Sequence, residues 1–235
     1  MSGNGSHIES HHPTFEQVSE RHRRRVLLQR AGSILRQLIE EKGVIVRGHF
    51  IGFSGRHLDA FVDKTLLLAD AQGLKQMALG IATLFADLKP DVVVGPKTGG
   101  AILASHVIRF LETDRDGERP LFVFSENDRG PHAIKRQFAP LVEGKRALIV
   151  DDVVTSGSTL HEVLDAVLEV GGVPVGVGVA LNRDAASVNQ NSFPVLFQHI
   201  LDLGLKSYTE EEMPERLRLI PVSSVLGHGK DRGKP

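Results

Sequence analysis

"ALIVDDVVTSGST", residues 147–159, decides the fold, because it runs from a short apolar segment through two adjacent aspartates into a loop of hydroxyl side chains and one glycine. The apolar residues 146–150 are typical of a strand that is covered on both faces of a parallel sheet. Residues 158–170 carry apolar side chains at helical spacing. The sequence therefore predicts a strand, a polar loop and a helix in direct succession.

The same alternation of strand and helix continues on both sides of this stretch. Strands are predicted at residues 91–95, 121–125 and 173–181, and helices at residues 73–88 and 99–111. Because strands that alternate with helices form parallel sheets, this order predicts an α/β fold with a mainly parallel open sheet and helices on both faces. From about Asn182 onward the sequence has no clear period and is expected to be irregular.

The segments around this core suggest four regions. Residues 1–13 are polar and rich in Gly, Ser and His, as in a disordered tail. Residues 14–70 combine a helix over about 15–42 with a β-branched and aromatic segment that is expected to form a small hood. Residues 71–205 then form the α/β core, and residues 206–235 a C-terminal extension.

Composition excludes several classes of protein. The 235 residues carry a formal net charge of -1, so the overall charge gives no reason to expect a nucleic-acid or membrane partner. The chain has no cysteine, which excludes disulfides, thiolate catalysis and cysteine-bound zinc. No apolar run approaches the roughly 20 residues of a membrane span, and the start lacks the apolar region of a signal peptide. We therefore expect a soluble, cytoplasmic protein.

The two aspartates and the loop after them predict a binding site for a sugar phosphate. Ligands of open parallel sheets bind beyond the carboxyl ends of the strands, where Asp151 and Asp152 emerge. Gly157 permits a tight turn, and the backbone N–H groups at the helix N-terminus favour an anion. Further donors are the hydroxyls of Thr155, Ser156, Ser158 and Thr159. A ribose 5-phosphate would fit both parts of this site, with its diol on the two aspartates and its phosphate in the loop.

Other interpretations of this loop fit less well. The chain has no G-x-x-x-x-G-K-[ST] motif, and its "GPKTGG" segment is not G-x-G-x-x-G. The alternative that stays open is an ordinary strand-to-helix loop in which an aspartate caps the helix. A cap needs only one aspartate, however, and two adjacent carboxylates repel each other. The pair therefore favours a binding site.

Residues 147–159 closely resemble the phosphoribosyl-pyrophosphate (PRPP) motif of the type I phosphoribosyltransferases, an apolar strand followed by D/E-D-x-x-T-x-G-x-T. The resemblance implies that Asp151 and Asp152 hold the ribose hydroxyls and act in catalysis. It also implies a Mg²⁺ cofactor that is bound mainly through the substrate, with both aspartates nearby. The PRPP-binding segment implied here comprises Asp151, Asp152, Val153, Val154, Thr155, Ser156, Gly157, Ser158 and Thr159.

A second segment, "VVVGPKTGG" at residues 92–100, looks like the pyrophosphate loop of the same family. Alone it is equally consistent with a plain strand-to-helix turn, but the PRPP motif about fifty residues downstream favours a site. The resemblance then adds Lys97, Thr98, Gly99 and Gly100 to the PRPP-binding residues. Lys97 is expected to act in catalysis by neutralising diphosphate charge, while the glycines permit close approach of the backbone.

The segment "GHFIGFSGRHLDAFVDKTLLL", residues 48–68, is similar to one in the orotate phosphoribosyltransferases, a branch of this family. The matching residues are Phe50, Ser54, Gly55, Arg56, His57 and Lys64, whereas Phe61 replaces a Tyr and Leu58 a common Ser. "ALNRD" at residues 180–184 resembles the segment whose arginine meets the orotate ring, and a guanidinium suits an anionic, carbonyl-rich base. The orotate-binding residues implied are Ser54, Arg56, Thr155 and Arg183. The alternative for Arg183 is a charge on a surface loop.

The chain departs from the family pattern where lysines are usual. The family covers its active site with a flexible loop donated by the neighbouring subunit, which implies a homodimer. That loop corresponds to residues 124–138, and Ser125 stands in place of a lysine. Phe53 and Gly99 also stand where lysines are common. Positive charge in the loop is expected from Arg129, His132, Lys135 and Arg136.

The resemblance covers roughly residues 25–185 and implies an activity. This activity is the transfer of ribose 5-phosphate from PRPP to orotate, which gives orotidine 5-monophosphate and pyrophosphate in pyrimidine biosynthesis. Because the lysines are altered, two alternatives stay open: a PRPP-binding regulator without turnover, and a phosphoribosyltransferase for another base.

Overall fold

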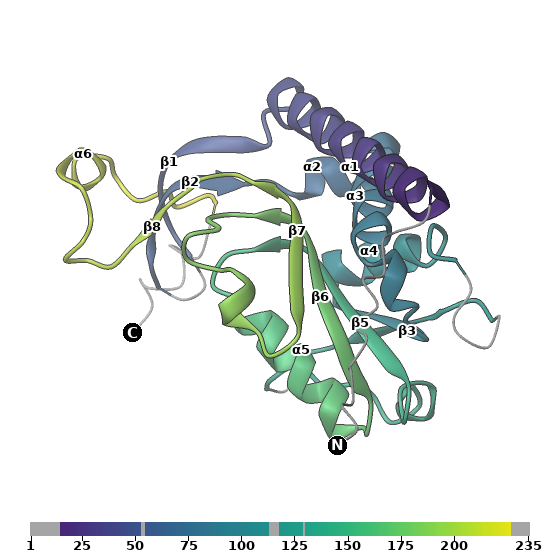
Figure 1. Cartoon of the computed structure of the whole chain (residues 1–235). Coiled ribbons are helices and arrows are strands. Elements are labelled where there is room, and N and C mark those ends of the chain that lie inside the picture. The colour runs from purple at the N-terminus through teal and green to yellow at the C-terminus, as the bar shows by residue number, and fades with distance from the viewer. Residues whose placement is uncertain (1–14, 53–54, 113–117, 129, 227–235) are drawn as a thin grey trace, which may run out of the picture.

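Five parallel strands form the central sheet, in the order β4-β3-β5-β6-β7 (Figure 1). The computed structural model describes residues 15–52, 55–112, 118–128 and 130–226. The strands are β3 (Val92–Pro96), β4 (Leu121–Ser125), β5 (Arg146–Val154), β6 (Val173–Asn182) and β7 (Leu196–Asp202). Every neighbouring pair is parallel, which confirms the predicted α/β fold.

Helices cover both faces of this sheet. They are α1 (Phe15–Glu41), α3 (Ala71–Leu84), α4 (Gly99–Val107) and α5 (Ser158–Glu169). Side chains alternate along a strand, so Leu148 and Val150 of β5 join the hydrophobic cluster under α3 and α4. Ala147 and Ile149 join the opposite cluster under α5. Figure 1 shows α5 on one side of the sheet and α3 and α4 on the other, with α1 packed outside α3.

A small antiparallel sheet, the hood, lies beside the core. It consists of β1 (Ile45–Ile51), β2 (His57–Val62) and β8 (Ser207–Tyr208). The remaining short elements are α2 (Thr65–Leu68), α6 (Glu215–Arg218), and the 3-10 turns η1 (Ala86–Leu88), η2 (Ala139–Leu141) and η3 (Gln190–Ser192). Because β8 completes this sheet, the C-terminal extension and the N-terminal hairpin form one unit.

Two expectations about strands are wrong. Residues 196–202 are not irregular, because they form β7, the edge strand that pairs with β6. Its sequence "LFQHILD" mixes polar with apolar side chains, since an edge strand is only partly buried. The strand before the acid pair also does not end there: β5 continues through Asp151 and Asp152 to Val154. The carboxylates are therefore buried within the strand and do not stand in a loop.

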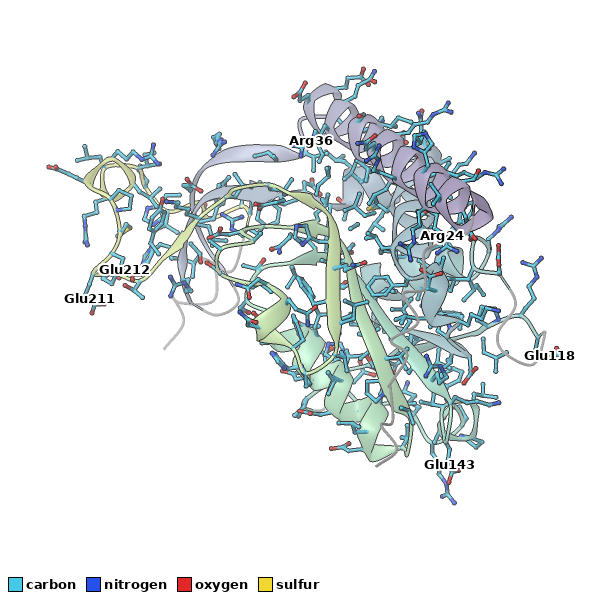
Figure 2. All side chains as sticks on the ribbon, viewed as in Figure 1. Arg24, Arg36, Glu118, Glu143, Glu211 and Glu212 are labelled. Atoms are coloured by element: carbon cyan, nitrogen blue, oxygen red, sulfur yellow. The ribbon has the colours of Figure 1, made fainter. Side chains whose placement is uncertain are left out.

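The remaining predicted elements need smaller adjustments. The helices predicted at 73–88 and 99–111 end earlier, at Leu84 and Val107. At the outer face of α1, Arg24 (labelled in Figure 2) forms ion pairs with Glu20 and Asp87. Residues 1–13, predicted as a disordered tail, lie outside the described residues. Within the described ranges, no helix is both long and apolar enough to cross a bilayer.

Candidate active site

A cavity of about 330 Å³ lies between the hood and the carboxyl end of β5. The hood side is lined by Ile51, Gly52, Leu58, Phe61, Val62 and Lys64. The core side is lined by Asp151, Val153, Val154, Thr155, Ser156, Gly157, Ser158, Thr159, Leu160 and Arg183. This volume is in the range of small-molecule sites. The fold thus brings the predicted acid, loop and arginine together in one cavity.

The acid pair at the end of β5 is buried, with Asp151 7% and Asp152 0% exposed. Burial, together with the charge of Asp152, raises the pKa of Asp151 to about 8. Burial also raises the pKa of Asp152, although Lys64 opposes the shift. Among the described residues, Asp152 Oδ2 has no hydrogen-bond partner. An unpartnered buried carboxylate oxygen is costly, and such groups occur most often at functional sites.

Lys64 is a site residue whose role the sequence did not reveal. Its ammonium group donates to Asp152 Oδ1 at 2.7 Å and lines the cavity from the hood side. Burial alone would lower the pKa of Lys64. The charges of Asp152 and Asp151 together raise it by more, so the pKa of Lys64 lies above its ordinary value. Lys64 matches the hood motif, yet only the fold places it against an acid 88 positions away.

The loop after β5 has the geometry of an anion site. Gly157 adopts φ +83°, a left-handed conformation that favours glycine, and α5 begins at the next residue. Thr155 and Ser156 are exposed to the cavity. The Ser156 and Ser158 hydroxyls lie 3.1 Å apart. Hydroxyls and the N–H groups of the first turn of α5 therefore point to the same place, as an anion requires.

The predicted pyrophosphate loop lies directly against the acid pair. A methyl group on Gly99 would overlap Asp152 Oδ2, so this position admits no larger residue without a shift of the acid. A methyl group on Gly100 would lie 2.9 Å from Asp151 Oδ1 and 2.5 Å from Pro96 Cδ. Both glycines therefore allow the start of α4 to approach the carboxylates.

A cluster of two lysines on one glutamate extends this loop. Glu126, 7% exposed, lies 3.3 Å from Lys97 Nζ through Oε1 and contacts Lys135 through Oε2. Lys135 has the largest effect on the pKa of Glu126 and lowers it. Burial raises this pKa and Lys97 lowers it, and the net pKa is below its ordinary value because the two lysines outweigh burial. Both lysine side chains remain about half exposed. They are held in place but keep their charge accessible.

The other predicted loop residues lie apart from this cluster. His132 is buried, and its Nδ1 lies 3.1 Å from Ser125 Oγ. Burial lowers the pKa of His132, although Glu162 opposes the shift. Arg136 is exposed, and Arg129 lies outside the described residues. Of the three described residues, His132, Lys135 and Arg136, the structure thus brings only Lys135 to Lys97.

Arg183 is not a surface charge, because only 3% of it is exposed. Its Nη2 lies 3.6 Å from Asp59 Oδ1 and donates to the Lys206 carbonyl at 3.2 Å. Arg56 instead turns to the C-terminal segment, where it donates to the Ser207 hydroxyl and carbonyl, and it is not among the cavity lining. Ser54 lies outside the described residues. Of the residues expected at the base, Arg183 and Thr155 therefore face one cavity.

A parallel sheet with a hood, and a buried acid pair directly before an anion-binding loop, define a phosphoribosyltransferase of type I. The phosphoribosyl transferase domain family matches residues 67–200, and the chain belongs to this family. Its curated relatives include the orotate phosphoribosyltransferase of Caldanaerobacter subterraneus subsp. tengcongensis, 33% identical over 79% of this chain and 92% of the relative. That of Thermus thermophilus is 32% identical over 80% and 98%. The chain thus groups with the orotate phosphoribosyltransferases.

Solved structures show the same fold. The orotate phosphoribosyltransferase of Mycobacterium tuberculosis in complex with PRPP has a TM-score of 0.54 and 23% identity, over 75% of this chain and 96% of that one. The adenine phosphoribosyltransferase of Thermoanaerobacter pseudethanolicus also has a TM-score of 0.54, with 17% identity over 72% and 99%. At these identities the likeness concerns the fold, which phosphoribosyltransferases of different bases share.

Proposed function

We propose that the protein transfers ribose 5-phosphate from PRPP to orotate and releases orotidine 5-monophosphate and pyrophosphate. The observation that carries this proposal is the buried pair Asp151 and Asp152 beside the 155–159 loop, with Asp151, the loop and Arg183 lining one cavity. The pair offers acceptors for a diol, the loop offers donors for a phosphate, and the arginine offers a cation for an anionic base.

The donor sugar binds across the acid pair and the loop. The Lys64 ammonium favours the ionised form of Asp152, whereas the raised pKa of Asp151 leaves that side chain mainly protonated at neutral pH. The pair presents several oxygens to the ribose hydroxyls. The 5-phosphate accepts hydrogen bonds from the backbone and hydroxyls of residues 155–159. Holding both ends of the sugar fixes its anomeric carbon in the cavity.

Mg²⁺ fits this site as a partner of the substrate. No three His, Asp or Glu side chains in the described part of the chain are grouped to hold a metal ion. The two carboxylates Asp151 and Asp152 are oxygen donors of the kind that Mg²⁺ prefers, and this ion commonly completes its shell with water and substrate phosphates. When bound, the ion supplies positive charge beside the diphosphate.

The chemical step separates charge, and the chain's own residues stabilise both parts. The bond from the anomeric carbon to the diphosphate breaks, its electron pair leaves with pyrophosphate, and the ring becomes oxocarbenium-like. The negative charge of the acid pair then lies beside the positive ring. Lys97 and Lys135, held together on Glu126, provide cations for the leaving diphosphate. Orotate N1 bonds to the anomeric carbon, and the departing pyrophosphate takes up the N1 proton.

The hood provides the walls around the acceptor base. Leu58, Phe61 and Val62 give the cavity an apolar side, and Arg183 and Thr155 provide polar contacts for the ring. An apolar wall limits the access of water, which would otherwise hydrolyse the activated sugar. We assign orotate to this end of the cavity because orotate is an anionic pyrimidine.

We also place the protein in the cytoplasm, because PRPP and orotate are metabolites of the cell interior.

A homodimer is the assembly we propose. A hollow of about 260 Å³ next to the pyrophosphate loop is lined by Lys97, Thr98, Ala101, Ile102, Ser105, Phe122 and Phe124. The hollow is mainly apolar and lies at β4, an edge strand of the sheet. Contiguous apolar surface of this kind is typical of protein interfaces. A second copy seated here would bring its own residues close to the pyrophosphate loop.

The activity is tested with purified protein, Mg²⁺, PRPP and orotate, by following the loss of orotate absorbance. We expect turnover in the wild type and a loss of at least about 100-fold in Asp152→Asn, because one aligned charge-stabilising group typically contributes that much. Asp87→Asn, which removes an exposed acid paired with Arg24, should leave the rate unchanged. PRPP binding without turnover would indicate a regulator, and turnover only with another base would indicate a different acceptor.

A further inference from the structure

One carboxylate on the hood is shared by three arginines. Asp59 of β2 lies 3.6 Å from Arg183 Nη2 through its Oδ1. Through its Oδ2 it lies 3.8 Å from Arg216 Nη2 and 4.0 Å from Arg47 Nη1. The arginines come from β1, from the end of β6 and from α6, so the cluster joins the hood, the core and the C-terminal segment.

The three arginines differ in their exposure to solvent. The side chains of Arg47 and Arg216 are 69% and 75% exposed, so water screens their charges. Arg183 is 3% exposed, and Asp59 is 17% exposed. Burial lowers the pKa of Arg183, while Asp59 opposes that shift. Asp59 therefore matters most to the buried guanidinium, where it stabilises the charge more than Asp184 does.

The contact between Asp59 and Arg183 leaves hydrogen-bonding capacity unused. At 3.6 Å it is an ion pair without a short hydrogen bond. Among the described residues, neither Asp59 Oδ1 nor Arg183 Nε has a hydrogen-bond partner. Arg183 lines the cavity, while its Nε is buried and has no partner among the described residues. An under-satisfied guanidinium at the wall of a cavity favours an anionic ligand.

The position of this cluster favours an anionic ligand. Arg183 lines the cavity and Asp59 does not, so a ligand at the hood end meets the guanidinium and not the carboxylate. We propose that Asp59 is a positioning residue, which holds Arg183 toward the cavity and sets the preference for an acceptor base that bears a carboxylate. This inference rests on the proposed function, because it concerns how the base is chosen in that same reaction.

The test compares kinetics for each substrate in Asp59→Asn, Asp59→Glu and the control Asp87→Asn. Asp59→Asn keeps the size of the side chain but loses the charge that holds Arg183. We expect kcat/KM for orotate to fall at least tenfold while KM for PRPP changes less than twofold, since the acid pair and loop remain intact. Asp59→Glu should recover part of the loss, and Asp87→Asn should match the wild type.

A second readout separates positioning from mere support of the fold. Uracil is orotate without its carboxylate, so the ratio of the orotate rate to the uracil rate measures the preference for that group. In Asp59→Asn the ratio of orotate to uracil turnover should shrink at least tenfold. A ratio equal to that of the wild type would overturn the inference, as would an equal loss for PRPP and orotate. A wild type that does not convert orotate would instead overturn the proposed function, and this inference with it.

Discussion

The buried position of Asp151 lowers the stability of the native state. The side chain is buried in β5 next to a second acid, and these surroundings raise its pKa to about 8. In the unfolded chain the pKa is near its ordinary value of 3.8. Proteins commonly retain such destabilising groups at functional sites, where they interact with substrate. Asp151 should therefore show a conflict between stability and activity.

The conflict depends on pH in a defined direction. Below pH 4 both states hold the proton, so Asp151 has no effect on stability. As the pH rises toward 8, the unfolded state ionises and the native state does not, so the free energy of unfolding falls. Asp151→Asn does not titrate and keeps an oxygen for the Asp152 N–H, which now donates to Asp151 Oδ1 at 2.8 Å. The variant should therefore gain stability relative to the wild type as pH rises.

Urea unfolding at pH 5 and pH 8 measures this gain. The stabilisation by Asp151→Asn should be larger at pH 8 than at pH 5, by at most about 4 kcal/mol, because one proton over three pH units is equivalent to about 1.4 kcal/mol for each unit. The same variant should lose most of its turnover. The control Asp87→Asn removes an acid that is 88% exposed and should show no such pH dependence. An equal effect at both pH values would contradict the buried-acid account.

Local chemistry explains which site residues could be predicted from the sequence. Asp151, Asp152 and Gly157 are close together in the chain, so one local sequence pattern predicts the strand, the acids and the turn. Lys64 and Asp59 act through contacts with Asp152 and Arg183, which are far away in sequence and meet only in the folded molecule. No local pattern distinguishes such residues from ordinary surface charges.

At the scale of elements, two buried histidines connect the hood to the C-terminal segment. His49 Nε2 on β1 lies 2.7 Å from His57 Nδ1 on β2. His57 Nε2 lies 3.1 Å from Glu210 Oε2, and His49 Nδ1 lies 2.8 Å from the Ile220 carbonyl oxygen. Both ends of the segment around α6 are thereby fixed to the hood.

Loss of this connection should release the segment. His49→Ala removes a buried ring and leaves the Ile220 carbonyl and the His57 ring each without one partner, so the segment should detach more often. Trypsin should then cleave at Arg216 or Arg218 several times faster than in the wild type, as followed by mass spectrometry. His22→Ala, on the exposed face of α1, should leave the cleavage rate unchanged. Equal rates in His49→Ala and wild type would show that the histidines do not hold the segment.

Strands could be predicted from the sequence where their residues are continuously apolar. β3, residues 147–150 of β5 and residues 173–181 of β6 carry no charged or amide side chains, because these strands lie inside the sheet with helices on both faces. β7 is an edge strand whose exposed and buried positions are mixed, so its seven residues lack a clear period. β8 has only two residues and pairs with β2 far upstream. Pairing of this kind is set by the tertiary fold and leaves little trace in the sequence.

At the scale of the whole molecule, the apolar surface beside the pyrophosphate loop is the feature that one chain leaves unexplained. Ile102 of α4 is 37% exposed there and adjoins Phe122 and Phe124 of β4. Since the hollow includes Lys97 and Thr98, an assembly through this surface would place the neighbouring chain next to the diphosphate. Assembly and turnover should then be lost together.

Ile102→Glu should separate the proposed dimer. A charge inside an apolar interface loses its hydration without gaining a partner, so the variant should elute as a monomer, with half the wild-type mass by light scattering. Its turnover should fall at least tenfold, while melting of the monomer should stay cooperative. Leu168→Glu is the matched control, because Leu168 is 52% exposed on α5, across the sheet, and its mass and turnover should not change. A wild type that is monomeric at assay concentration would contradict the proposed dimer. An Ile102→Glu variant that remains a dimer would show that the interface lies elsewhere.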